Sequence, residues 1–144
     1  EGVVAVDVAS AKHVQGEVDY PQTPPLGGDH APRWQNCGAY SEPISAEAGV
    51  HALEHGAVWI TYQPTLDPVE IATLEGIVDQ SDYILVTPWP DDLPAPIVAS
   101  AWGAQLPLDS ADDPRLMEFL TAYVQALTAP EPGAPCSGGI SASR

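Results

Sequence analysis

The stretch Ala57–Val78, AVWITYQPTLDPVEIATLEGIV, decides the fold. Its first residues, AVWITYQ, are branched and aromatic and stop at Pro64, a pattern typical of a strand. Asp67 then precedes Pro68, and Glu70 follows three residues after Asp67, which predicts a capped helix that begins at Pro68. A strand that leads directly into an apolar helix is typical of a domain in which helices cover a sheet.

Two more strands and a second helix are predicted downstream. Residues 83–87 (YILVT) read as a strand, and residues 97–102 begin a third, with Gly103 as a bulge or bend before residues 105–108. A helix is predicted over residues 113–127. The side chains expected to be buried are Val69, Ile71, Leu74, Ile77 and Val78 on the first helix and Leu116, Phe119, Leu120, Tyr123, Val124 and Leu127 on the second.

The length of 144 residues fits a single domain with irregular ends. Residues 1–12 are expected to form a tail or an edge strand, and residues 13–45, rich in proline and glycine, an irregular wrap over a binding site. Residues 46–127 are expected to carry the core and residues 128–144 a loop-like tail. The predicted fold class is α+β: a small mixed sheet with a β-α-β-β-α core, two helices on one face and a long irregular N-terminal loop region.

The charge balance excludes some partners. The chain carries 20 Asp+Glu against 4 Lys+Arg, a formal net charge of −16. Phosphate groups of nucleic acids and of anionic membrane surfaces repel such a chain, so no nucleic acid is expected as a partner. The sequence also lacks a G-x-S-x-G elbow, a P-loop, a G-x-G-x-x-G turn, a C-x-x-C pair and an EF-hand loop.

The histidines are clustered in the first part of the chain. His13, His30, His51 and His55 are the four in the sequence, and none follows residue 55. His51 and His55 are four residues apart, so they share one face either of a helix or of an extended strand. On a helix Glu54 lies near the same face, and the string then matches the H-x-x-E-H signature of zinc proteases, with Glu54 as general base; on a strand Glu54 points away.

We therefore predict a metal site with His30, His51 and His55 as ligands. His13, a water or an exogenous group is the candidate for a fourth ligand, and Glu54 is expected in the second shell, where it orients an imidazole. Copper is the expected ion because Cu²⁺ heads the affinity series for such ligands, and zinc is the alternative.

The two cysteines, Cys37 and Cys136, allow two interpretations. As an even, well separated pair they predict a disulfide, which implies an oxidising compartment. The alternative is that Cys37 is a thiolate ligand of a copper site.

Several strings in the chain resemble one known family. They are Tyr20-Pro21, Pro24-Pro25, Gly28-Asp29-His30, Trp34, Cys37-Gly38-x-Tyr40, Pro43, Val50-His51-x-Leu53-Glu54-His55-Gly56-Ala57-Val58-Trp59-Ile60-x-Tyr62 and Ala101-Trp102-Gly103. Together they resemble the domain of unknown function 3105 family over His13 to Cys136. The resemblance implies an outward-facing, extracytoplasmic domain, often preceded by an N-terminal membrane segment, and it implies no activity.

The hypothesis from sequence is an extracytoplasmic metal-binding protein that binds, delivers or oxidises and reduces copper. Two alternatives remain: a zinc-dependent hydrolase that uses Glu54, and a non-catalytic interaction module of a membrane complex. The expected partners are a metal ion and a membrane complex or metallochaperone. Because the chain does not open with methionine, we expect Glu1 to be a processing boundary. The family resemblance implies that a segment upstream tethers the domain.

Overall fold

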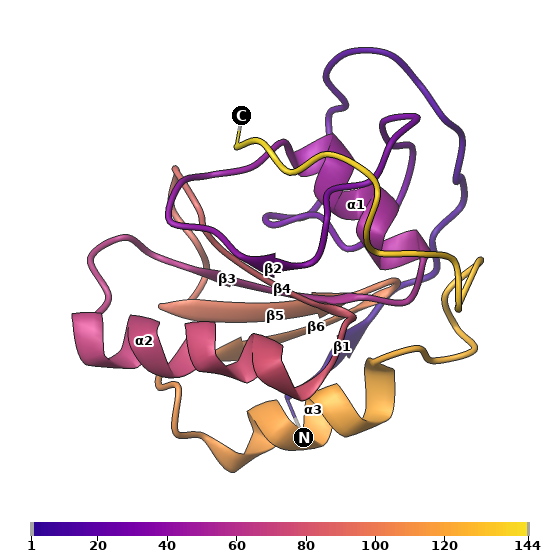
Figure 1. Ribbon diagram of the computed structural model, residues 1–144. Helices are drawn as coiled ribbons and strands as arrows, with labels where there is room; N and C mark the ends of the chain where they lie inside the picture. Colours follow the sequence, from indigo (N-terminus) through magenta and orange to yellow (C-terminus); the bar gives the residue numbers. More distant parts are fainter. Residues whose placement is uncertain (1, 144) are drawn as a thin grey trace.

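A mixed β-sheet forms the middle layer of the computed structural model, which describes residues 2–143 (Figure 1). The strands are β1 (Val4–Ala5), β2 (Gly38–Ala39), β3 (Val58–Tyr62), β4 (Ile84–Pro88), β5 (Ile97–Ala101) and β6 (Ala104–Leu108). The helices are α1 (Ala46–Glu54), α2 (Pro68–Ile77) and α3 (Pro114–Tyr123), with a short 3₁₀ turn, η1 (Val78–Gln80), after α2.

The strand order in the sheet is β1-β6-β5-β3-β4-β2. Strands β2, β4 and β3 run parallel to one another, whereas β5 pairs antiparallel with β3 and with β6, and β1 pairs antiparallel with β6. Trp59 in β3 therefore lies between Leu85 of β4 and Ser100 of β5. The parallel pair β3–β4 is joined through α2, as parallel strands require a crossover.

Helices α2 and α3 cover one face of the sheet, the lower face in Figure 1. Asp67 caps α2 by accepting a hydrogen bond from the amide of Val69, and Asp113 caps α3 in the same way. Leu74 and Ile77 of α2 and Leu116, Phe119 and Leu120 of α3 pack against the strands. The predicted α+β class, with a small mixed sheet and two helices on one face, is confirmed. The core order is β-α-β-β-β-α rather than β-α-β-β-α, because residues 97–108 form two antiparallel strands and not one bent strand.

The opposite face is covered by α1, by irregular chain from the N-terminal wrap (residues 13–45) and by a C-terminal strap (residues 128–143) (Figure 1). Helix α1 packs on Trp59, which is fully buried and donates a hydrogen bond from its indole nitrogen to Thr87 Oγ1 at 2.9 Å. Both faces are thus buried, which explains why every residue of β3, β4 and β5 is buried and why their sequences do not alternate.

Three details refine or correct the sequence predictions. Of the bulge and the bend expected at Gly103, the structure has the bend: with φ of +80° Gly103 sits in the tight turn that joins β5 to β6. Val69 is 73% exposed because it lies in the first turn of α2 on the side away from the sheet. Leu127 is 93% exposed because α3 ends at Tyr123 and Gln125 then adopts a left-handed conformation, with φ of +56°.

A disulfide between Cys37 and Cys136 joins the wrap to the strap. The amide of Cys37 also donates to the carbonyl of Cys136, and the amides of Asn36 and Ile140 continue this pairing along the strap. The disulfide indicates an oxidising, extracytoplasmic environment, and it leaves neither cysteine as a thiolate ligand. Among residues 2–143, no helix has the length and apolar character needed to span a membrane.

Candidate metal centre

Helix α1 supplies two side chains of the centre, His51 and Glu54. Ser45 caps the helix by accepting a hydrogen bond from the amide of Ala48 at 3.2 Å. Residues three apart in a helix lie on one face, so His51 and Glu54 point the same way. Each is only 3% exposed. Of the two conformations that the His51–His55 spacing allowed, the structure has the helix.

The N-terminal wrap brings His13 and His30 to the same place. The Asp29 carboxylate accepts hydrogen bonds from the Ser10 hydroxyl and the Lys12 amide, and the hydroxyl bond in particular lowers the pKa of Asp29. The amide of Val14 donates to the carbonyl of His30, so His13 and His30 lie side by side as a parallel bridge. His30 is fully buried, whereas the side chain of His13 is 50% exposed.

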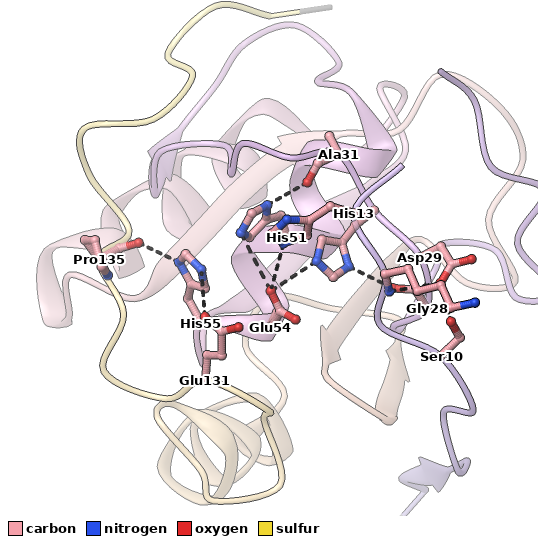
Figure 2. A network of polar contacts seen from close by, with 12 residues as sticks. Ser10, His13, Gly28, Asp29, Ala31, His51, Glu54, His55, Glu131 and Pro135 are labelled. Carbon is pink, nitrogen blue, oxygen red and sulfur yellow. Dashed lines mark hydrogen bonds and ion pairs between the residues drawn. The ribbon is translucent and has the colours of Figure 1, made fainter. Parts of the chain in front are cut away.

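Three imidazole nitrogens converge on a single oxygen (Figure 2). Glu54 Oε1 lies 3.1 Å from Nε2 of His30, 3.7 Å from Nε2 of His51 and 3.8 Å from Nε2 of His13. The four residues offer ligand atoms that all lie within 4.8 Å of one another. The ring centroids of the three histidines are 4.7–4.9 Å apart.

The second nitrogen of each buried histidine in this group is anchored to the backbone. Nδ1 of His30 lies 2.8 Å from the carbonyl oxygen of Gly28, and Nδ1 of His51 lies 2.7 Å from that of Ala31. A carbonyl can only accept, so each Nδ1 carries a proton and donates it. In a neutral imidazole Nε2 then holds a lone pair, which is the form and orientation that metal-binding histidines adopt.

The electrostatic surroundings keep His51 in this neutral form. Burial lowers its pKa to about 4, the bond to the Ala31 carbonyl opposes the shift, and the neighbouring imidazoles of His30, His55 and His13 add to it. At neutral pH the Nε2 atom of His51 therefore faces the Glu54 carboxylate with a lone pair rather than a proton. Lone pairs that face one another in a buried space are the arrangement that a cation stabilises.

The ring of His55 lies beside that of His51, with centroids 4.6 Å apart, but its Nε2 is directed toward Glu131. His55 forms the C-cap of α1, donates Nδ1–H to the carbonyl of Pro135 at 2.7 Å, and places Nε2 3.9 Å from Glu131 Oε1. The structure thus brings His13, His30 and His51 together around Oε1 of Glu54, and puts His55 in a second group with Glu54 and Glu131. A single zinc ion held by the H-x-x-E-H motif would need His51 and His55 in one group of ligand atoms. The structure places them in two different groups.

Three contributors to the site are not identified by the sequence reasoning. The ring of Trp34 covers the imidazoles of His51 and His55, with centroids 5.6 Å and 5.0 Å away. Glu131 lies in a segment rich in proline and glycine, with no motif to mark it. The position of the Pro135 carbonyl depends on the folded path of the strap. The one sequence signal for it is the neighbouring Cys136, whose predicted disulfide fixes the strap to the wrap.

The donor set is one that divalent transition metals accept. Ligand atoms around an ion in a tetrahedron with bonds of about 2.0–2.2 Å lie about 3.3–3.6 Å apart. The three distances from Glu54 Oε1, 3.1–3.8 Å, bracket that value. Three nitrogens and one oxygen, with no thiolate, suit Zn²⁺ or Cu²⁺.

Comparison with known proteins identifies a family. Residues 13–138 match the family described as Protein of unknown function (DUF3105). The comparisons with curated proteins and with solved structures gave no match. Because the family match covers most of the chain, the chain belongs to the DUF3105 family, as its motifs indicated.

Proposed function

We propose that this DUF3105 protein is a metal-binding domain that holds a divalent transition-metal ion between His13, His30, His51 and Glu54. The observation that carries the proposal is the convergence of three Nε2 atoms on Glu54 Oε1, where the two buried rings are oriented by backbone carbonyls. A histidine cluster that merely packed would not need its lone pairs turned toward a buried carboxylate.

Copper is the ion that we propose, with zinc as the alternative. Cu²⁺ binds N and O ligands more tightly than the other divalent ions of its row. The distances of 3.1–3.8 Å from Glu54 Oε1 to the three imidazoles also suit zinc, whose structural sites are four-coordinate. The exposed edge of His13 gives the ion a route from solvent. The centre therefore suits binding and delivery, and it suits redox chemistry if a ligand such as His13 can leave.

The setting we propose is the outer side of a membrane. The disulfide supports an oxidising compartment, and an anchor upstream of residue 1 would keep the domain near a membrane complex or a metallochaperone that exchanges the ion. The net charge of −16 supports recruitment of cations to the surface.

The test is metal analysis of the protein purified without a histidine tag. After dialysis against Cu²⁺ or Zn²⁺ and removal of free ion, the wild type is expected to retain metal, and His30→Gln and His51→Gln to lose it. His13→Ala serves as a third variant because His13 is half exposed and its removal leaves the core intact. Its affinity is expected to fall by about tenfold or more.

Glu118→Gln is the matched control, since it removes one exposed carboxylate on the far face of the sheet. It is expected to retain metal as the wild type does. Wild-type protein that folds with its disulfide intact and retains neither ion after dialysis contradicts the proposal.

A further inference from the structure

His55 has a buried nitrogen that the proposed centre does not use. The residue is 3% exposed, and its Nδ1–H is donated to the Pro135 carbonyl. When this ring is neutral, the proton is on Nδ1 and Nε2 holds a lone pair. Its charged neighbour is Glu131 Oε1 at 3.9 Å, which is beyond hydrogen-bond distance but within the span of two ligands of one ion.

Glu131 is held in place although its side chain is 56% exposed. Its backbone amide donates to the carbonyl of Glu54 at 2.9 Å, which fixes the strap to the end of α1. The Cys37–Cys136 disulfide and the Pro135 contact hold the same segment a few residues later. The carboxylate therefore lies beside His55 because of the covalent and hydrogen-bonded path of the strap.

The surroundings favour a cation at this position. Glu54 is the last residue of α1 and His55 is its C-cap, so the negative end of the helix dipole points here. Two carboxylates and an imidazole, from Glu54, Glu131 and His55, offer ligand atoms within 4.8 Å of one another. Figure 2 shows Glu54 between the two histidine groups, with Glu131 below His55.

We infer that His55, Glu131 and Glu54 bind a second divalent ion, and that Glu54 serves both sites. This inference rests on the proposed function, because it gives Glu54 a second role beside the first ion. The second site holds one nitrogen and two oxygen donors, a set that suits zinc better than cuprous copper. Its carboxylate from Glu131 is 56% exposed, which gives an ion access to this site from solvent.

The test is a calorimetric titration of the tag-free, metal-free full chain with Zn²⁺. The wild type is expected to take up about two equivalents in a tight and a weaker step. Glu131→Gln is expected to take up about one equivalent and to keep the tight step, while Glu118→Gln keeps both. The inference is overturned if wild type and Glu131→Gln each bind a single equivalent of Zn²⁺ with equal affinity.

A spectroscopic readout separates this inference from the proposed function. With Cu²⁺ as the probe, two ions that share Glu54 are expected to show magnetic coupling in the wild type, and Glu131→Gln to show an uncoupled single-ion signal. If the wild type shows an uncoupled single-ion Cu²⁺ signal and His30→Gln loses it, the second site is contradicted and the first proposed site is supported. No bound copper or zinc in the wild type contradicts both proposals. His55→Gln, which keeps a polar side chain of similar size, is expected to behave as Glu131→Gln does.

Discussion

Oε1 of Glu54 lies 3.1 Å from Nε2 of His30, and both side chains are buried. Nδ1 of His30 donates its proton to the Gly28 carbonyl, so in a neutral ring this contact sets the lone pair of Nε2 against a lone pair of the carboxylate. A proton or a metal ion must relieve that arrangement. Removing the negative charge of Glu54 is therefore the most direct test of whether this centre binds a metal ion.

Glu54→Gln is expected to separate the stability of the apo protein from metal binding. The amide can donate to the His30 lone pair, so the apo variant is expected to be as stable as the apo wild type or more so. In the wild type, metal at about 100 times its dissociation constant is expected to raise Tm by about 5–10 °C, and in the variant it is not. Thermal unfolding with and without chelator measures both effects.

Glu118→Gln is the control for this comparison and is expected to keep the metal-dependent rise. An equal rise in Glu54→Gln and in wild type would show that the carboxylate is not a ligand.

The stability of the apo protein is expected to fall as pH is lowered from about 6.5 toward 4. The pKa of His51 is about 4 in the folded state, below its ordinary value of 6.5, because burial disfavours the imidazolium. Over that interval the unfolded chain takes up a proton at this residue before the folded chain does, so unfolding becomes easier. Urea midpoints measured with chelator across this interval, for wild type and His51→Gln, report the effect. A variant whose midpoint falls as steeply as that of the wild type would contradict it.

Gly49→Ala is expected to destabilise the protein by about 1–3 kcal/mol, although alanine is the better helix former. A Cβ at this position would lie 2.6 Å from Cζ3 and 2.7 Å from Cη2 of Trp59, which is buried on all sides. Gly76→Ala in α2 is the matched control, because a Cβ there has open space around it, and it is expected to stabilise by up to about 1 kcal/mol. Urea unfolding of both variants checks the pair; the same sign for both would be inconsistent with the packing described.

Removal of the disulfide by Cys37→Ala/Cys136→Ala is expected to lower the free energy of unfolding by about 4–5 kcal/mol in the chain-entropy model, since the bridge joins residues 99 apart. It also frees the segment that carries Glu131 and the Pro135 carbonyl. The zinc titration of the double variant is therefore expected to lose the weaker step and keep the tight one. Retention of both steps would show that the strap does not depend on the bridge.

Local sequence patterns were enough to place most of the regular structure. The Asp67-Pro68 and Asp113-Pro114 pairs mark helix starts by capping chemistry that acts within a few residues, and both helices begin there. The predictions are wrong where tertiary packing determines where a helix ends. Leu127 fits the helical period, but the chain leaves the helix after Tyr123, where the Val124 backbone is extended. The spacing of His51 and His55 fits a helix and a strand equally well, so it does not predict helix α1.

The sequence pointed to the histidines and Glu54 of the candidate centre, but not to how they are grouped. His30 and His51 were expected to share an ion, and the structure places their rings 4.7 Å apart. His13 was the candidate fourth ligand, and the Asp29 contacts that place it beside His30 cannot be read from residue spacing. Whether Glu54 faces the ion or an imidazole depends on rotamers and on the path of the wrap, which only the fold fixes.

The parallel bridge between His13 and His30 links occupancy of the centre to the motion of the main chain. Its two amides, those of Val14 and His30, are protected from solvent deuterium by hydrogen bonds at a point where little regular structure supports them. An ion that fixes both imidazoles would hold this bridge closed, so the isotope exchange rates of two backbone sites would reveal the loading state of the protein without a colour, a label or an enzymatic turnover.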